Sequence, residues 1–152
     1  MSNSQFKPLV AVIATGGTIA SKRGEDGAAT PTLNGDDLLA TLGDVGAQLR
    51  PIDLMAKDSS SLTLIDMQTI SDAVAAQIAD PEIHGVVVLH GTDDMEETAL
   101  LVHLQHHLSK PVIFTGAQFT ADHPDADGPS NLTTAINLAT DPANAQKGVL
   151  IA

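Results

Sequence analysis

Five short apolar runs, separated by longer helical or polar segments, constrain the fold of this chain more than any other feature. Their β-branched residues are typical of strands that are buried on both faces of a sheet. Strands that alternate with helices predict a parallel sheet covered by helices. We therefore predict an α/β fold: a single-domain three-layer sandwich around a mainly parallel five-stranded sheet. The predicted strands are residues 8–14, 49–56, 85–89, 111–115 and 148–152.

Four of the connecting segments have the pattern of helices. Asn34 is a suitable N-cap, and two aspartates follow it where a helix dipole favours negative charge. Thr63 and Asp66 have the spacing of a capping box at the start of a longer helix. The predicted helices are residues 36–42, the segment from Thr63 to about Asp80, residues 95–108 and residues 131–139.

The connection after the first strand is unusually polar. Residues 22–32 contain Gly24, Gly27 and Pro31, which predicts a loop. It is longer than most connections in compact domains, and loops of this length often act as lids over a binding site.

Composition excludes several classes of function. The chain has 152 residues, enough for one domain with a core, and no cysteine, so disulfides and cysteine-bound zinc are excluded. A net charge of −12 and the absence of Tyr and Trp argue against binding to nucleic acid or to an anionic membrane. No apolar run is long enough for a membrane span, and the first residues lack the pattern of a signal peptide. We expect a cytoplasmic protein.

The first predicted strand ends in Thr15-Gly16-Gly17-Thr18. Two glycines permit a sharp turn and the close approach of a ligand. The motif fits a plain tight turn, and it equally fits a nucleophilic site with backbone N–H groups for an oxyanion. It matches neither the dinucleotide-binding fingerprint nor the Walker loop.

The third predicted strand is followed by His90-Gly91-Thr92-Asp93. Ligands of open α/β sheets bind at the carboxyl ends of strands, so a hydroxyl and a carboxylate there are candidates for chemistry. Helix capping is the alternative, because Thr is a good N-cap and acidic residues suit a helix N-terminus. Capping does not account for His90-Gly91, where the backbone must bend tightly.

Two further groups of polar residues have two interpretations each. Residues 59–61 are three serines, which form either a solvated loop or a binding site for a carboxylate. His103, His106 and His107 can share one helix face, which makes a metal site conceivable. No carboxylate is placed to complete it, and histidines near a helix C-terminus are favoured by the dipole alone. We predict no metal and no cofactor.

Three motifs resemble those of the bacterial-type asparaginases, in the same order and at similar spacings. The resemblance extends from Leu9 to the end and corresponds to the N-terminal domain of the usual two-domain enzyme, as in short-chain asparaginases. It implies a flavodoxin-like fold, with residues 1–152 as one N-terminal-type domain and no C-terminal domain. The motifs are Thr15-Gly16-Gly17-Thr18-Ile19-Ala20, His90-Gly91-Thr92-Asp93 with Met95-Glu96-Glu97-Thr98, and Ala126-Asp127-Gly128-Pro129 with Asn131-Leu132.

The resemblance implies hydrolysis of L-asparagine to aspartate and ammonia through a threonine acyl-enzyme, with L-glutamine as a poorer substrate. Thr18 matches the family's nucleophile, Thr92 its second catalytic threonine, and Asp93 the carboxylate that binds the substrate's α-amino group. Ser59 matches the serine that binds the α-carboxylate. The implied substrate-binding set is Gly17, Ser59, Ser60, Gly91, Thr92, Asp93 and Ala117.

The sequence departs from the family at the groups that activate the nucleophile. The family has a tyrosine on the lid, a lysine beyond the fifth strand, and an acidic residue from the C-terminal domain. This chain has no tyrosine, and the other two lie past Ala152. Lys22 or Lys57 could substitute, and weak substrate affinity is expected because fewer groups hold the amino acid.

Two alternatives to a self-sufficient enzyme stay open. One is a non-catalytic amino-acid-binding or regulatory module, and the other is an amide-processing subunit that needs a partner chain. Family members are oligomers, and a domain without its usual neighbour exposes apolar surface, so we expect a homo-oligomer, a dimer or tetramer. Because the chain stops on a predicted strand, either the fold ends with its sheet or the chain is incomplete.

Overall fold

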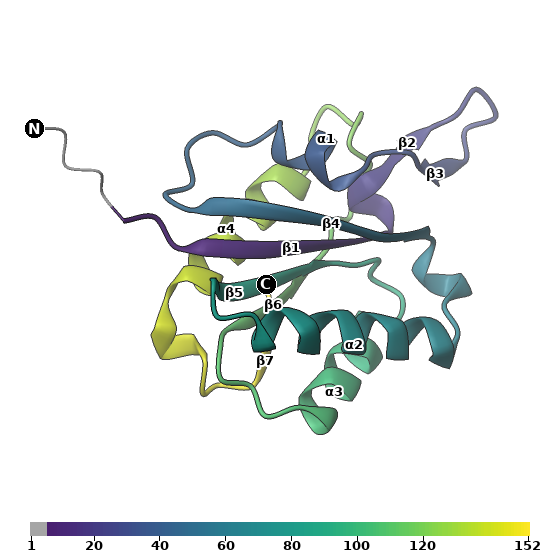
Figure 1. Cartoon of the computed structure of the whole chain (residues 1–152). Helices are drawn as coiled ribbons and strands as arrows, with labels where there is room; N and C mark the ends of the chain where they lie inside the picture. Colours follow the sequence, from purple (N-terminus) through teal and green to yellow (C-terminus); the bar gives the residue numbers. More distant parts are fainter. Residues whose placement is uncertain (1–5) are drawn as a thin grey trace, which may run out of the picture.

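The computed structural model describes residues 6–152, which form a five-stranded sheet between two layers of helices (Figure 1). All neighbouring strands of the sheet are parallel, as predicted. Counted along the chain, the sheet strands lie in the flavodoxin-like order 2-1-3-4-5. The spatial order is β4 (Gln48–Lys57), β1 (Leu9–Gly16), β5 (Ile83–Leu89), β6 (Val112–Thr115) and β7 (Val149–Ile151).

The helices divide the hydrophobic core into two layers, one on each face of the sheet. Helices α1 (Gly35–Leu39) and α4 (Gly128–Thr140) cover one face, and α2 (Leu64–Ala79) and α3 (Met95–Gln105) cover the other (Figure 1). Side chains alternate between the faces along β1, as the pleat of a strand requires. Val10 packs with the first layer of helices, whereas Ala11 packs with the second. The predicted three-layer sandwich is therefore confirmed.

The predicted helix starts at Asn34 and Thr63 are both capping boxes. Asn34 Oδ1 accepts the N–H of Asp37 at 2.8 Å, and the Asp37 carboxylate accepts the N–H of Asn34. Thr63 and Asp66 make the same reciprocal pair of hydrogen bonds at the start of α2. These interactions are local, so they could be read from sequence spacing alone.

The prediction of an unstructured loop over residues 22–32 is wrong. The segment forms an antiparallel hairpin of β2 (Ser21–Arg23) and β3 (Ala29–Pro31) that projects beyond the sheet (Figure 1). Its turn is closed by Gly27, at φ 79°, and by the Asp26 carboxylate, which accepts the N–H of Ala28. Turn chemistry therefore organises a stretch whose polarity indicated only a loop.

Two helix boundaries also differ from prediction. Helix α3 ends at Gln105 rather than Leu108, because His106 is extended and its ring contacts Ser71 Oγ of α2 at 2.8 Å. Helix α4 begins at Gly128 rather than Asn131. Pro129 suits the first turn, where its missing N–H has no helical partner. Among residues 6–152, no helix has the length and apolar character of a membrane span.

Candidate functional site

The sheet has a topological switch point between β1 and β5, where the chain changes direction. Strands β1 and β5 are neighbours, but β1 leads to β4 on one side and β5 leads to β6 on the other. Open α/β sheets bind ligands beyond the carboxyl ends of strands at such a switch point. Gly17 follows β1 there, and Gly91 lies just after β5. A Cβ atom on Gly17 would lie 2.5 Å from Gly91 Cα, so the two turns touch.

A third loop joins these two turns. Ser59, in the short 3-10 helix η2 (Ser59–Ser61) after β4, is 2 % exposed and packs against Gly91. Its Oγ donates to Asp93 Oδ2 at 3.2 Å and accepts the N–H of Asp93 at 3.2 Å. The loops after β4, β1 and β5 therefore meet in a row, with a hydroxyl and a carboxylate side by side.

Thr92 does not cap the helix that follows it. The N-cap of α3 is Asp94, whose side chain makes no capping hydrogen bond, so helix capping is not how the structure uses Thr92. Thr92 is exposed and, with Ala117, lines a hollow of about 200 Å³ at the carboxyl edge of the sheet. The remaining lining residues are Met95, Gly116, Gln118, Asp127, Asn131, Ile151 and Ala152.

Thr18 and Ser60 lie near this region but do not line the hollow. Thr18 is half-buried and begins the 3-10 helix η1 (Thr18–Ala20), directly after Gly17. Ser60 is exposed, and its Oγ donates to the Asp58 carboxylate at 3.1 Å. Of the predicted site residues, the structure brings Gly17, Gly91, Ser59 and Asp93 into one contact group, and Thr92 and Ala117 into the adjoining hollow.

The prediction that Lys57 could substitute for a catalytic lysine is not supported by its contacts. Its ammonium lies 2.7 Å from the Asp66 carboxylate at the start of α2. That hydrogen bond, together with those from the Thr63 N–H and hydroxyl, lowers the pKa of Asp66 to about 2. Lys22, the other candidate, is exposed on β2 of the hairpin.

His90 lies fully buried beneath the turn that carries Thr92 and Asp93. Its Nδ1 is 2.6 Å from the Gly91 carbonyl oxygen, which can only accept, so Nδ1 carries the proton. Nε2 lies 3.0 Å from the Thr98 hydroxyl, which also donates to the Asp94 carbonyl oxygen at 3.1 Å. Burial lowers the pKa of His90, which favours the neutral ring, despite the hydrogen bond to Gly91 and the nearby acidic side chains.

Asp127 and Asn131 are site-lining residues to which the sequence analysis assigned no role. They lie one helical turn apart at the start of α4 and line the hollow opposite Thr92. The signal that could have identified them is their i, i+4 spacing within the third motif, which follows the loop after β6.

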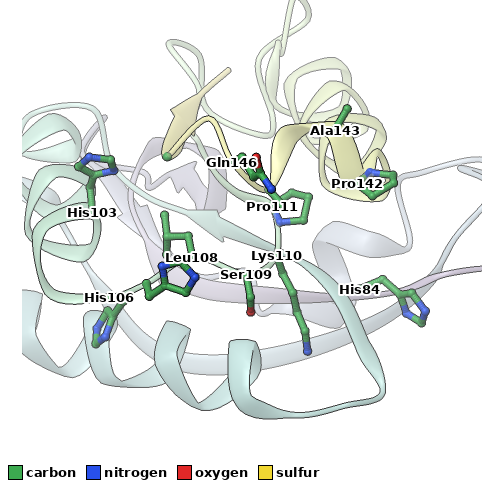
Figure 2. A pocket seen from close by; sticks show the side chains of 13 residues that line it. His84, His103, His106, Leu108, Ser109, Lys110, Pro111, Pro142, Ala143 and Gln146 are labelled. Atoms are coloured by element: carbon green, nitrogen blue, oxygen red, sulfur yellow. The ribbon is translucent and has the colours of Figure 1, made fainter.

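A larger hollow of the described residues lies at the opposite edge of the sheet. This groove of about 1010 Å³ borders the start of β6 and contains four histidines but no carboxylate (Figure 2). Its histidines do not point at one common centre, because His84 and His106 lie at opposite ends of the groove (Figure 2). Lys110, which also lines the groove, donates to the Asp80 carbonyl oxygen. No three His, Asp or Glu side chains within residues 6–152 are grouped to hold a metal ion. The polar side chains that do lie together, such as Ser59 and Asp93, are beyond the carboxyl ends of the strands.

Comparisons with known proteins show the family to which the chain belongs. A sequence model described as "Asparaginase, N-terminal" matches residues 9–152. The glutaminase-asparaginase of Acinetobacter glutaminasificans is 33% identical over 152 residues, which cover 95% of this chain and 46% of that protein. The probable L-asparaginase 1 of Schizosaccharomyces pombe is 31% identical over 150 residues, 95% of this chain and 42% of that protein.

The fold agrees as well. A crystal structure of a probable cytoplasmic L-asparaginase from Campylobacter jejuni matches with a TM-score of 0.85 and 32% identity. The match covers 96% of this chain and 44% of that one, so the chain spans less than half the length of these relatives. Because the family match covers nearly all of its residues and the fold agrees along the same stretch, the chain belongs to the asparaginase family.

Proposed function

We propose that this chain carries an asparagine-hydrolysing site at the switch point of its sheet. The observation that supports this most is the Ser59–Asp93 pair, at 3.2 Å, beside the Gly17–Gly91 contact. An amino-acid head group carries one positive and one negative charge. A carboxylate and a serine hydroxyl fixed side by side suit those two charges, with Asp93 binding the ammonium group and Ser59 the carboxylate.

The proposed reaction uses Thr18 as the nucleophile. Thr18 Oγ attacks the carbon of the substrate's side-chain amide, and an ester forms as the C–N bond breaks and ammonia leaves with the hydroxyl proton. Water then cleaves the ester, which releases aspartate and restores the threonine. Backbone N–H groups near the glycine turn are the candidates to bind the oxyanion of each step, apart from that of Gly17, which donates to the Lys57 carbonyl oxygen at 2.9 Å. L-glutamine, one methylene longer, is expected to be the poorer substrate.

Thr92 and Ala117 are proposed to bind the side-chain amide from the other wall of the site. They line the 200 Å³ hollow, whereas Ser59 and Asp93 belong to the adjoining contact group. The two ends of the substrate are thus assigned to different side chains, although Thr92 and Asp93 are neighbours on the loop after β5. Because the Lys57 ammonium is ion-paired with Asp66, we expect slow turnover. We expect weak affinity because few groups hold the amino acid.

The test is the Thr18→Ala variant in a coupled ammonia assay with asparagine and glutamine measured side by side. We expect it to abolish ammonia release and to leave the far-ultraviolet circular dichroism unchanged. Thr69→Ala is the matched control, because Thr69 is exposed on α2 and its hydroxyl bonds only within that helix. Full activity in Thr18→Ala would assign the nucleophile to another residue.

A second candidate function is an amino-acid-binding or regulatory module. It is favoured by the contact between Lys57 and Asp66, which turns the nearest lysine of the serine loop toward α2. Calorimetry with L-aspartate, run beside the ammonia assay, separates the two functions. Binding without turnover would support the module, and binding with turnover would support the enzyme.

We also propose that the chain forms a homo-oligomer. Leu100 and Leu104, one turn apart on α3, are 55% and 73% exposed, and Leu64 and Ile65 at the start of α2 are 79% and 80% exposed. Exposed apolar side chains on two packed helices favour a covered surface. Light scattering tests this proposal, and we expect Leu104→Glu to shift the mass toward that of a monomer. Cytoplasmic location and a single N-terminal-type domain over residues 1–152 stay predictions.

A further inference from the structure

The loop after β6 forms the wall of the hollow that faces Thr92. Gly116 begins this loop, and a Cβ atom there would lie 2.6 Å from the His90 carbonyl oxygen and 3.4 Å from Thr92 Cγ2. The loop backbone therefore packs directly against the turn that carries Thr92. Ala117, the next residue, is buried and lines the same hollow. Any shift of this wall changes the space beside the Thr92 side chain.

Two side chains from the start of α4 hold the loop in that position. The Asp127 carboxylate accepts the N–H of Gln118 at 2.9 Å and that of Phe119 at 3.0 Å. Asn131 Nδ2 donates to the Gly116 carbonyl oxygen at 3.0 Å and to Asp127 Oδ2 at 3.1 Å. The backbone groups at both ends of the loop are thus bonded to one pair of side chains, which are also bonded to each other.

The carboxylate form of Asp127 is required for this arrangement. Burial would by itself raise the pKa of Asp127, but the N–H groups of Gln118 and Phe119 and the amide of Asn131 outweigh it and hold the pKa below its usual value. A carboxylate accepts at both oxygens, so it can receive all three donors. An asparagine at the same position would direct an NH₂ group at one of them.

We propose that Asp127 and Asn131 are positioning residues, which hold the Gly116–Phe119 loop against Thr92 and so orient the scissile side-chain amide of the substrate. This inference rests on the proposed function for the site. It assigns the pair to the amide end of the substrate and leaves the amino-acid head to Ser59 and Asp93. Neither Asp127 nor Asn131 touches the reacting atoms in this scheme, because each acts through the loop backbone.

Because Asp127 and Asn131 are assigned to the amide end of the substrate only, their loss is predicted to change kcat rather than KM. Loss of the Asp127 or Asn131 contacts removes neither of the hydrogen bonds between Ser59 and Asp93, so we expect binding of the head group to persist. Misplacing a reacting group by about 1 Å can lower the rate by roughly 100-fold. We therefore expect kcat to fall by about 10- to 100-fold and KM to change by less than about threefold.

The experiment compares Asp127→Ala, Asp127→Asn and Asn131→Ala in the ammonia assay with asparagine. Asp125→Ala is the matched control, because it removes an exposed carboxylate from the same segment without touching the loop bonds. We expect Asp127→Asn to retain more kcat than Asp127→Ala, since one acceptor oxygen remains. A kcat within about twofold of the control in the alanine variants that keep wild-type circular dichroism would overturn the proposal.

A second readout does not depend on turnover. In ¹H–¹⁵N spectra of the 152-residue chain, Asn131→Ala and Asp127→Asn should shift the amide signals of Gln118 and Phe119 and also that of Thr92, whereas Asp125→Ala should leave Thr92 unmoved. Absence of ammonia release from the unsubstituted chain would refute the proposed function alone. An unmoved Thr92 amide in both variants would refute the positioning role, whatever the activity.

Discussion

Gly91→Ala is the substitution that tests the site architecture most directly. Gly91 is buried where the loops after β1, β4 and β5 meet, and its φ is not in the left-handed region. An added Cβ would lie 2.6 Å from Ser59 Cβ and 3.2 Å from Ser59 N. Neither atom can swing aside as the end of a flexible side chain could. The methyl group must therefore push the whole loop after β4 away from the turn after β5.

The expected loss of stability follows from two contributions. Forcing an extra methyl group into a packed site costs about 1–3 kcal/mol. Moving Ser59 away from Asp93 also removes the hydrogen bonds from Ser59 Oγ to the Asp93 carboxylate and from the Asp93 N–H to Ser59 Oγ, each with a net contribution of about 1 kcal/mol. We therefore expect the free energy of unfolding to fall by about 3–5 kcal/mol and substrate binding to be lost.

Gly43→Ala is the matched control, because nothing lies within 4 Å of a Cβ placed there and its φ is also outside the left-handed region. It should change stability by less than about 1 kcal/mol, and in the stabilising direction. Urea titrations followed by circular dichroism measure both variants. With a slope of about 2 kcal/mol per molar urea, the midpoint of Gly91→Ala should fall by about 1.5–2.5 M. Equal midpoints for the two variants would refute the contact between these loops.

Two further predictions concern titrating groups. The pKa of buried His90 in the folded chain is below its unfolded value of 6.5, so the unfolded chain binds a proton first as the pH falls. The free energy of unfolding should therefore fall as the pH drops below 6.5, by up to about 1.4 kcal/mol per pH unit. Urea midpoints at pH 7.5 and 5.5 check this, and His90→Gln should weaken the pH dependence of the midpoint. For Lys57→Met, we expect the pKa of Asp66 to rise from about 2 toward 3.8, measured by NMR titration. Ammonia release should stay within about twofold, and its loss would show that Lys57 has a catalytic role.

The layered fold and its helix starts could be predicted because they depend on local patterns. The β-branched run over residues 85–89 predicts a strand that is buried on both faces, and β5 covers that run. The capping box at Thr63 and Asp66 depends on a spacing of three residues, which can be read directly from the sequence. The hairpin over residues 22–32 was missed because its pairing depends on turn geometry within a polar stretch, where no hydrophobic alternation marks the strands.

The sequence by itself determined which segments become the five strands of the parallel sheet and the four α-helices, and which motifs follow the carboxyl ends of those strands. Strand order and side-chain partners were decided only by the tertiary structure. Three contacts are examples: that of Gly17 with Gly91, the ion pair of Lys57 with Asp66, and the hydrogen bonds of Asp127 to the loop after β6. The physical reason is that an apolar pattern specifies which face of an element is buried, whereas the direction of a buried hydrogen bond depends on which loops the finished sheet brings together.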